Sequence, residues 1–308
     1  MPKYTLKNYS EEFLPLQEKV GKEVTKEWKD FGQSSAERLK QVYSQPDFDP
    51  ETRHYAFSGN DLVGFLTSKI LPVGKDGIKK ASLEFPLVLP GHESCADLLY
   101  QKAEETLKKK GVKIAEARVG EIWKGTIDKA KKYGYKYARD MYVLLELKVD
   151  KARVKSTTGI IISTYDHSKD FNDIVKIFVE KLNWTEKAAR DNFETINKEK
   201  EQNPIHLIYR ENNKIVARIL ASKNKENPKR FEIGTLYCEN EKYVESLLIN
   251  VIMKVKALKG TEISTYLSGK ALAFEKYFQQ IGFNRIGKID CYEKKIDTTK
   301  EKPTLSEN

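Results

Sequence analysis

Residues 53–66 are RHYAFSGNDLVGFL, and residues 205–220 are IHLIYRENNKIVARIL. Each stretch is an apolar or aromatic run, a polar turn that contains Asn, and a second apolar run, which is typical of a β-hairpin. Three further features follow in the same order in both halves, at Leu98-Leu99, Gly111 and Gly134-Tyr135 in the first and at Leu247-Leu248, Gly260 and Gly282-Phe283 in the second. Because four matches recur at a spacing of about 150 residues, the sequence predicts a duplicated unit.

The length and composition suit two domains. Of the 308 residues, 39% are hydrophobic and 10% aromatic, which is enough for two modest cores. We predict an N-terminal domain over residues 1–148, a polar and basic linker over 149–158, a C-terminal domain over 159–297 and a disordered tail over 298–308.

Within each half, strands and helices are mixed in the order of an α/β protein. The first half has a helical pattern from residue 11 to about 43 and a central helix over about 95–110, which Gly111 ends. In the second half we expect an opening strand over 159–164 and a central helix over about 243–258, which Gly260 ends.

Several classes of protein are disfavoured. No apolar run reaches the roughly 18 residues needed to span a bilayer, and the first residues lack a signal peptide, so we expect a cytoplasmic protein without a membrane partner. The three cysteines and four histidines are scattered, so we predict no metal site and no disulfide framework. A net charge of +10 is compatible with a phosphorylated ligand, with nucleic acid or with a solubilising surface.

Four segments carry a resemblance to a known family. Residues 81–90, ASLEFPLVLP, and 231–238, FEIGTLYC, each precede a predicted helix, and residues 129–135, KAKKYGY, and 277–283, YFQQIGF, lie before the last strand of each half. They resemble the GNAT superfamily of acyl-CoA-dependent N-acyltransferases, over nearly all of both halves. The resemblance implies two tandem GNAT-like domains of mixed α+β class, each a mostly antiparallel sheet with a central splayed strand pair flanked by helices. It also implies acetyl-CoA or another acyl-CoA as cofactor, and an amine of unknown identity as acceptor.

In this family the loop after the splayed strand and the next helix N-terminus present N–H groups to the pyrophosphate of coenzyme A. The usual loop, R/Q-x-x-G-x-G/A, is missing from both halves: residues 90–95, PGHESC, have one glycine, and residues 238–243, CENEKY, have none. Because small and polar residues suit phosphate, the first loop is the favoured cofactor site. The resemblance implies cofactor contacts from Val88, Leu89, Gly91, His92, Ser94, Leu236, Cys238 and Lys242.

Acyl transfer also needs a base for the incoming ammonium and an acid for the departing thiolate. Family members often carry a carboxylate in the splayed strand, so Glu84 and Glu232, which we place at equivalent strand positions, are the candidate bases; the alternative is that each faces solvent. In the family, the acid is a tyrosine four residues before the glycine of the segment that precedes the last strand. This chain has Ala130 and Phe278 there, and neither side chain can donate a proton.

Three functions therefore remain open. The first is an acyl-CoA-dependent N-acyltransferase, an acetyltransferase in the simplest case, in which the N-terminal half binds the cofactor. The second is a catalytically inactive GNAT-like module that binds a protein partner. The third is nucleic-acid binding through the basic runs 108–110, 129–132 and 148–155, which lack a recognised motif and also suit solvated helix faces.

Overall fold

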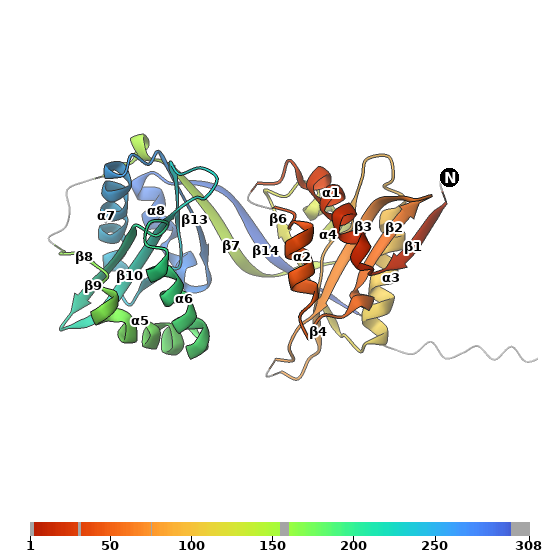
Figure 1. Ribbon diagram of the computed structural model, residues 1–308, viewed down its shortest axis with the longest axis horizontal. Coiled ribbons are helices and arrows are strands. Elements are labelled where there is room, and N and C mark those ends of the chain that lie inside the picture. The colour runs from red at the N-terminus through yellow and green to blue at the C-terminus, as the bar shows by residue number, and fades with distance from the viewer. Residues whose placement is uncertain (1–2, 30–31, 75, 155–159, 297–308) are drawn as a thin grey trace, which may run out of the picture. The chain divides into compact units, whose positions relative to one another are not determined.

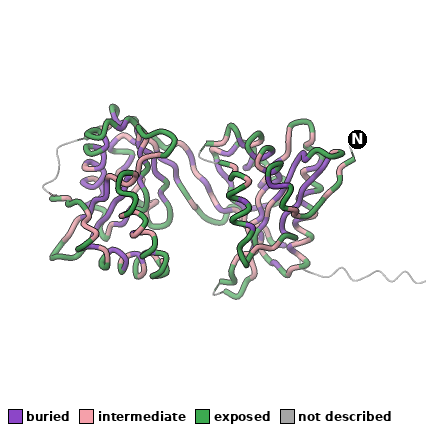
Figure 2. The backbone as a smooth tube through the Cα atoms, viewed as in Figure 1, coloured by how far each residue is buried: buried purple, intermediate pink, exposed green. Residues whose placement is uncertain are grey.

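The computed structural model describes residues 3–29, 32–74, 76–154 and 160–296, which divide into two compact units (Figure 1). Unit 1 consists of residues 1–140 and 289–308, and unit 2 of residues 141–288. Buried residues concentrate on the strands and on the sheet-facing sides of the helices within each unit (Figure 2). No helix in the described residues is long and apolar enough to cross a membrane.

The sheet of unit 1 is antiparallel except for one central parallel pair. Its strand order is β1-β2-β3-β4-β6-β14, and β4 and β6 form the parallel pair. The strands are β1 (Tyr4–Asn8), β2 (Arg53–Ser58), β3 (Asp61–Ile70), β4 (Lys80–Leu83), β5 (Leu87–Val88), β6 (Ile114–Gly120) and residues 289–295 of β14 (Asn284–Lys295). The short β5 continues the course of β4 and pairs with β3.

Helices cover both faces of this sheet because successive residues of its strands point to opposite faces and both faces are apolar. Tyr55 and Phe57 face a core with Phe13 and Val20, on the side of α1 (Leu14–Thr25) and α2 (Ala36–Tyr43). Ala56 faces the other core, with α3 (Cys95–Lys109) and α4 (Thr126–Lys132). The 3-10 turns are Glu11–Phe13 and Pro50–Thr52.

Unit 2 repeats this plan. Its strand order is β7-β13-β11-β10-β9-β8, with β11 and β13 as the parallel pair, and β12 pairs with β10. The strands are residues 141–148 of β7 (Lys136–Lys148), β8 (Ser163–Thr164), β9 (Ile205–Glu211), β10 (Lys214–Lys223), β11 (Arg230–Ile233), β12 (Tyr237–Cys238) and β13 (Glu262–Ser268).

The helices of unit 2 are arranged in the same way around their sheet. One core lies under α5 (His167–Leu182) and α6 (Glu186–Lys198), and the other under α7 (Val244–Ala257) and α8 (Glu275–Ile281). Further 3-10 turns are Val149–Lys151, Glu241–Tyr243 and Gly269–Phe274.

Each unit takes its last strand from the other half of the sequence. Residues 289–295 of β14 pair antiparallel with β6 of unit 1, and residues 142–148 of β7 pair antiparallel with β13 of unit 2. The expected boundaries at residues 148 and 159 place both segments in the opposite domain. The structure therefore corrects the expected domain boundaries.

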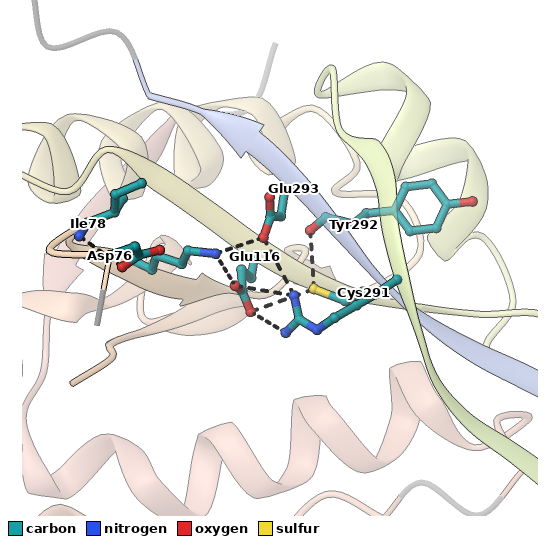
Figure 3. Close-up of polar contacts among 8 residues, drawn as sticks. Asp76, Ile78, Glu116, Cys291, Tyr292 and Glu293 are labelled. Atoms are coloured by element: carbon teal, nitrogen blue, oxygen red, sulfur yellow. Dashed lines mark hydrogen bonds and ion pairs between the residues drawn. The ribbon is translucent and has the colours of Figure 1, made fainter. Parts of the chain in front are cut away.

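A cluster of charges holds β14 in the sheet of unit 1 (Figure 3). Glu293 of β14 lies beside Glu116 of β6, and the Lys80 ammonium is 3.0 Å from the first carboxylate and 3.2 Å from the second. The Arg139 guanidinium lies 2.9 Å from Glu116, and the buried Cys291 thiol donates to the same carboxylate at 3.6 Å. Two cations thus balance two neighbouring carboxylates in this cluster.

Unit 2 has a simpler version of this cluster. Glu146 of β7 lies beside Ser264 of β13, and its carboxylate is 3.3 Å from the guanidinium of Arg230 on β11. Arg230 occupies the place of Lys80, and Glu146 the place of Glu293, in the strand register. In both units a cation on the first parallel strand therefore binds a carboxylate on the last strand.

The predicted helices over 95–110 and 243–258 are confirmed by α3 and α7. The expected strand over 159–164 is wrong for residues 160–162, which are unpaired, although Ile160 and Ile162 pack on the core. The expected linker is wrong at its start, because Val149 is buried in unit 2 and its N–H donates to the Thr261 carbonyl at 2.9 Å. Residues 155–158 of the expected linker, residue 159 and the expected tail lie outside the described residues.

Candidate functional site

The parallel strands of unit 1 separate after three residue pairs. β4 and β6 pair from Lys80 with Ile114 to Ser82 with Glu116. The Glu84 N–H then donates to the Thr67 carbonyl on β3 at 3.2 Å, and β5 stays paired with β3. The chain beyond residue 83 thus follows β3 and leaves β6, which opens the sheet at Glu84.

Unit 2 has the same opening one residue later. β11 and β13 pair from Arg230 to Ile233, and the Gly234 N–H then donates to the Leu220 carbonyl of β10 at 3.0 Å. The expected splayed strand pair is therefore present in both units.

The hydrogen-bond register corrects the expected equivalence of Glu84 and Glu232. Glu232 lies opposite Ser264 in the parallel pair, as Ser82 lies opposite Glu116. Glu84 corresponds instead to Gly234, since both N–H groups make the first bond beyond the opening. Glu232 is exposed and accepts a hydrogen bond from Asn224 at 2.5 Å. Only unit 1 thus carries a carboxylate where its strands separate.

A cavity of about 430 Å³ covers this opening on the α1 and α2 face of unit 1. Its walls come from α1, α2, the segment between them, β3, the β4–β5 segment, β6 and the segment after β6. They are mixed in character, because aromatic side chains alternate with uncharged polar ones and one pair of opposite charges. This is the composition of a site for a small ligand with both apolar and polar parts.

The two charges in the wall are Glu84 and Arg118. The Arg118 Nε and Nη2 atoms lie 3.0 and 2.9 Å from the same carboxylate oxygen, Oε1 of Glu84. The guanidinium is also 5.6 Å from the ring centroid of Trp123, which stacks on Trp28 at 5.7 Å with an angle of 13° between the rings. The indoles therefore support the arginine, and the arginine positions the carboxylate at the opening.

The buried side-chain amide of Gln17, which also lines the cavity, is held by two hydrogen bonds. The Gln17 Oε1 atom accepts from the Tyr55 hydroxyl at 2.7 Å, and its Nε2 atom donates to the Tyr43 hydroxyl at 3.3 Å. Burial raises the pKa of Tyr55, so its hydroxyl remains a neutral donor. Gln17 and Tyr43 both line the cavity, so α1 and α2 present it with a rigid, uncharged surface.

The corresponding face of unit 2 is packed with side chains. Arg218 of β10 occupies the place of Phe65 of β3, because Arg218 pairs with Tyr237 as Phe65 pairs with Leu87. Its side chain is 1% exposed and lies 5.3 Å from the ring centroids of both Phe178 and Phe193.

Two hydrogen bonds fix Arg218 in this position. Its Nε donates to His206 Nε2 at 2.9 Å, and its Nη1 donates to the Thr235 carbonyl at 2.8 Å. Burial lowers the pKa of His206 to about 2 and that of Arg218 to about 9, so a neutral imidazole accepts from a cation. Arg218 thus fills the face that unit 1 leaves open.

The loop between β5 and α3 in unit 1 already binds a carboxylate. The Gly91 N–H donates to Glu93 Oε1 at 3.0 Å, and bonds from the N–H groups of Glu93 itself and of Gly91 lower the pKa of the Glu93 carboxyl. Gly91 has a φ of +87° and open space where a Cβ would lie. The loop amides are therefore able to hold an anion, and Glu93 supplies it here.

Comparison with known proteins identifies the fold. No protein-family model and no curated protein matches the sequence. The structure is similar to a GCN5-related N-acetyltransferase from Sphaerobacter thermophilus, with a TM-score of 0.67 and 13% identity over 95% of this chain and 96% of that one. It is equally similar to a tandem GNAT protein from the clavulanic acid biosynthesis pathway, with a TM-score of 0.66 and 13% identity over 97% and 100% of the two chains. This chain has a tandem GNAT fold.

A more distant match bears on the acyl group. N-myristoyltransferase from Saccharomyces cerevisiae, solved with bound myristoyl-CoA, has a TM-score of 0.51 and 12% identity over 95% of this chain and 78% of its own. The same tandem fold is therefore found in proteins described with acyl groups of very different length.

The remaining residues of unit 1 that are predicted to contact the cofactor form hydrogen bonds or strand pairs with neighbouring residues. The Tyr4 hydroxyl lies 3.3 Å from Nδ1 of His92 and accepts from the Ser94 hydroxyl at 3.2 Å. Val88 pairs with Gly64 in the sheet, and the Leu89 N–H donates to the Val63 carbonyl at 2.8 Å. These contacts engage all four residues with neighbours in unit 1, and their role at a cofactor stays a prediction.

On the α3 and α4 face of this GNAT unit, aromatic rings lie behind the opening. Tyr100 and Tyr133 stack at 3.8 Å, and Phe85 lies 6.2 Å from the Tyr133 ring. Asp97 in the first turn of α3 pairs with Lys132 at 2.5 Å and accepts from the Tyr133 hydroxyl at 3.0 Å. The start of α3 is thus tied to the end of α4 in this conformation.

Ala130, which stands where the family carries its tyrosine, is fully buried, and its methyl group cannot donate a proton. Its neighbour Lys129 donates to the Pro86 carbonyl at 3.0 Å, and burial lowers the pKa of this ammonium. Lys129 is thus a partly desolvated ammonium one residue before the position where the family carries its tyrosine.

In the second GNAT unit, the residues predicted for the cofactor are engaged elsewhere. Leu236 is buried in the core, and burial raises the pKa of the Cys238 thiol to about 12. The Lys242 ammonium lies 3.5 Å from Glu211 and 4.8 Å from the Tyr243 ring centroid. Phe278, at the tyrosine position, is a fully buried core residue.

Sequence reasoning missed the side chains that build the cavity around Glu84. Arg118, Trp28 and Trp123 come from three separate segments, and only folding brings them together. One signal was available, because two of the chain's three tryptophans lie in the first half and converge on one site. Among residues 3–29, 32–74, 76–154 and 160–296, no three His, Cys, Asp or Glu side chains gather to hold a metal ion.

Proposed function

We propose that this chain is an acyl-CoA-dependent N-acyltransferase whose acceptor amine binds in the cavity of unit 1. One observation carries the proposal: a carboxylate lies at the point where the parallel strands separate, in the wall of a cavity of ligand size. The solved structures of this fold that are described as N-acetyltransferases or as an N-myristoyltransferase support acyl transfer to an amine.

Glu84 is suited to accept the proton of the incoming ammonium. Arg118 binds its Oε1 atom, and within the part of the chain that the structure describes Oε2 has no partner. An ammonium at Oε2 gives one proton to the carboxylate and becomes a nucleophilic amine. A base in this position typically contributes about 10²–10⁴ to the rate.

Acyl-CoA would supply the acyl thioester as the second substrate. The loop around Gly91 would hold its phosphates, because the amides there already bind a carboxylate and the glycine leaves open space. Transfer forms the N–C bond, breaks the C–S bond and releases a second proton from nitrogen, while the departing thiolate takes up one proton. Lys129, whose ammonium donates to the Pro86 carbonyl just beyond the opening, is a candidate to give that proton.

The test is acyl transfer measured as released thiol, with acetyl-CoA and a long-chain acyl-CoA against a panel of amines. We expect turnover in the wild type, loss of at least about a hundredfold in kcat/KM for Glu84→Gln, and little change for Glu232→Gln. Equal losses in both variants would contradict the assignment of the base to unit 1. If neither the wild type nor Glu93→Gln binds coenzyme A, the chain is instead a non-catalytic module with this fold.

A further inference from the structure

The charged pair in the cavity leaves one atom free on each partner. Arg118 uses Nε and Nη2 for Glu84, and its Nη1 has no partner among the described residues. Glu84 uses Oε1 and leaves Oε2 free. The Arg118 side chain is 43% exposed and the Glu84 side chain 28% exposed, and both residues line the cavity. An open donor with positive charge thus lies next to an open acceptor with negative charge.

We infer that the acceptor is a free α-amino acid with an apolar or aromatic side chain; this rests on the proposed function. An α-amino acid carries its ammonium and its carboxylate on the same carbon. Its ammonium would bind Glu84 Oε2 while its carboxylate binds Arg118 Nη1. Each charge of the zwitterion would then meet the opposite charge of the Glu84–Arg118 pair. Arginine is well suited to this task, because its planar guanidinium presents fixed donors to a carboxylate.

The aromatic wall selects the side chain. Trp123 and Trp28 stack beside Arg118, and Tyr43 and Phe65 line the same cavity. These rings offer apolar area to a bulky side chain and leave it no charged partner. A volume of about 430 Å³ lies in the lower part of the usual range of about 300–1,000 Å³ for small-molecule sites. A free amino acid suits this space better than a folded protein surface.

Other amine classes fit the pair less well. A diamine or polyamine would bring a second positive charge toward the Arg118 guanidinium, which repels it. An amine without a carboxylate would not engage Arg118 Nη1 and would therefore lack one charge-assisted hydrogen bond. The carboxylate should therefore add affinity, and removing Arg118 should abolish that gain.

The experiment is calorimetric titration of the full chain without acyl-CoA. The ligands are L-phenylalanine, 2-phenylethylamine without the carboxylate, 3-phenylpropionate without the amine, and glycine without the ring. We expect L-phenylalanine to bind at least tenfold more tightly than each of the other three. A wild type that binds 2-phenylethylamine as tightly as L-phenylalanine overturns the inference.

Variants locate the effect. Arg118→Gln should remove the preference for L-phenylalanine over 2-phenylethylamine, and Arg118→Lys should retain part of it. Arg190→Gln is the matched control: this arginine of unit 2 also donates through Nε to a carboxylate, that of Glu186 at 2.8 Å, and lies 5.5 Å from an aromatic ring centroid. The inference is overturned if Arg118→Gln keeps the preference. Circular dichroism checks that each variant is folded.

The readouts separate this inference from the proposed function. Tight L-phenylalanine binding without any acyl transfer would refute the enzymatic proposal and leave the amino-acid site standing. Acyl transfer to 2-phenylethylamine, with no binding of L-phenylalanine, would do the reverse. Transfer to L-phenylalanine that is lost in Arg118→Gln and kept in Arg190→Gln would support both.

Discussion

Glu116 is the residue whose replacement should most clearly weaken unit 1. Burial alone would raise the pKa of its carboxyl, but hydrogen bonds from Arg139 and Lys80 outweigh burial and bring it from 4.5 to about 2. A difference of this size corresponds to about 3 kcal/mol in favour of the ionised, folded state. Solvent screens the site little, because the side chain is 14% exposed. We therefore expect Glu116→Gln to lower the free energy of unfolding at pH 7 by about 2–3 kcal/mol.

The pH dependence follows from the sign of the shift. The pKa of Glu116 is lower in the folded state, so its contribution is fully present above about pH 4.5 and is lost as the pH falls through about 2. The gap between wild type and Glu116→Gln should therefore be constant from pH 7 to 5 and shrink between about pH 4.5 and 2.

Equilibrium urea unfolding at pH 7, 4 and 3, followed by circular dichroism, measures this gap. Glu186→Gln, which breaks an exposed pair with Arg190 on α6, is the control and should cost less than about 0.5 kcal/mol at any pH. A Glu116→Gln deficit that stays the same from pH 7 to pH 3 would show that packing, and not charge, explains the effect. No deficit at pH 7 would refute the argument that this cluster holds β14.

Three further outcomes follow from the site. Glu93→Gln removes the carboxylate charge that lies on the Gly91 amide, so coenzyme A should bind severalfold more tightly by calorimetry; weaker binding would show that Glu93 shapes the loop and does not block it. If Glu84 is the base, Glu84→Gln should lower kcat as well as kcat/KM, and an unchanged kcat would exclude Glu84. Phe278→Ala should cost about 3–5 kcal/mol of stability in thermal or urea unfolding, since the ring is fully buried, with acyl transfer per folded molecule retained; selective loss of transfer would give Phe278 a role at the site.

The sequence was sufficient for the fold because the fold depends on patterns that repeat. The hairpins at residues 53–66 and 205–220 became β2–β3 and β9–β10. The first central helix ends at Gly111 as predicted, whereas in the second Lys259, one residue before Gly260, takes the left-handed conformation after the C-cap. Alternating apolar residues specify such elements locally. They do not specify which sheet receives a last strand, so the exchange of β7 and β14 had no local signal.

The prediction that Glu84 and Glu232 are equivalent was wrong for a related reason. Both lie in short apolar runs, and matching glutamate with glutamate is the natural alignment of the two stretches. Hydrogen bonds instead place Glu232 opposite Ser264 and Gly234 at the opening. A shift in register of two keeps each side chain on the same face of its strand, so alternation gives no warning of it. Register is set by partners far along the chain, and these became visible only in the structure.

The two units have diverged at equivalent positions. Unit 1 has Phe65 and Glu84 where unit 2 has Arg218 and Gly234, so one keeps a cavity with a carboxylate and the other fills its interior with a buried cation. The second half of the sequence is nevertheless needed at the site, because residues 289–295 supply the strand that covers the edge of β6. Without it, β6 would expose unpaired N–H and C=O groups beside Arg118. The second half of the sequence therefore contributes to unit 1 through this strand, although its own face at Arg218 is filled by side chains.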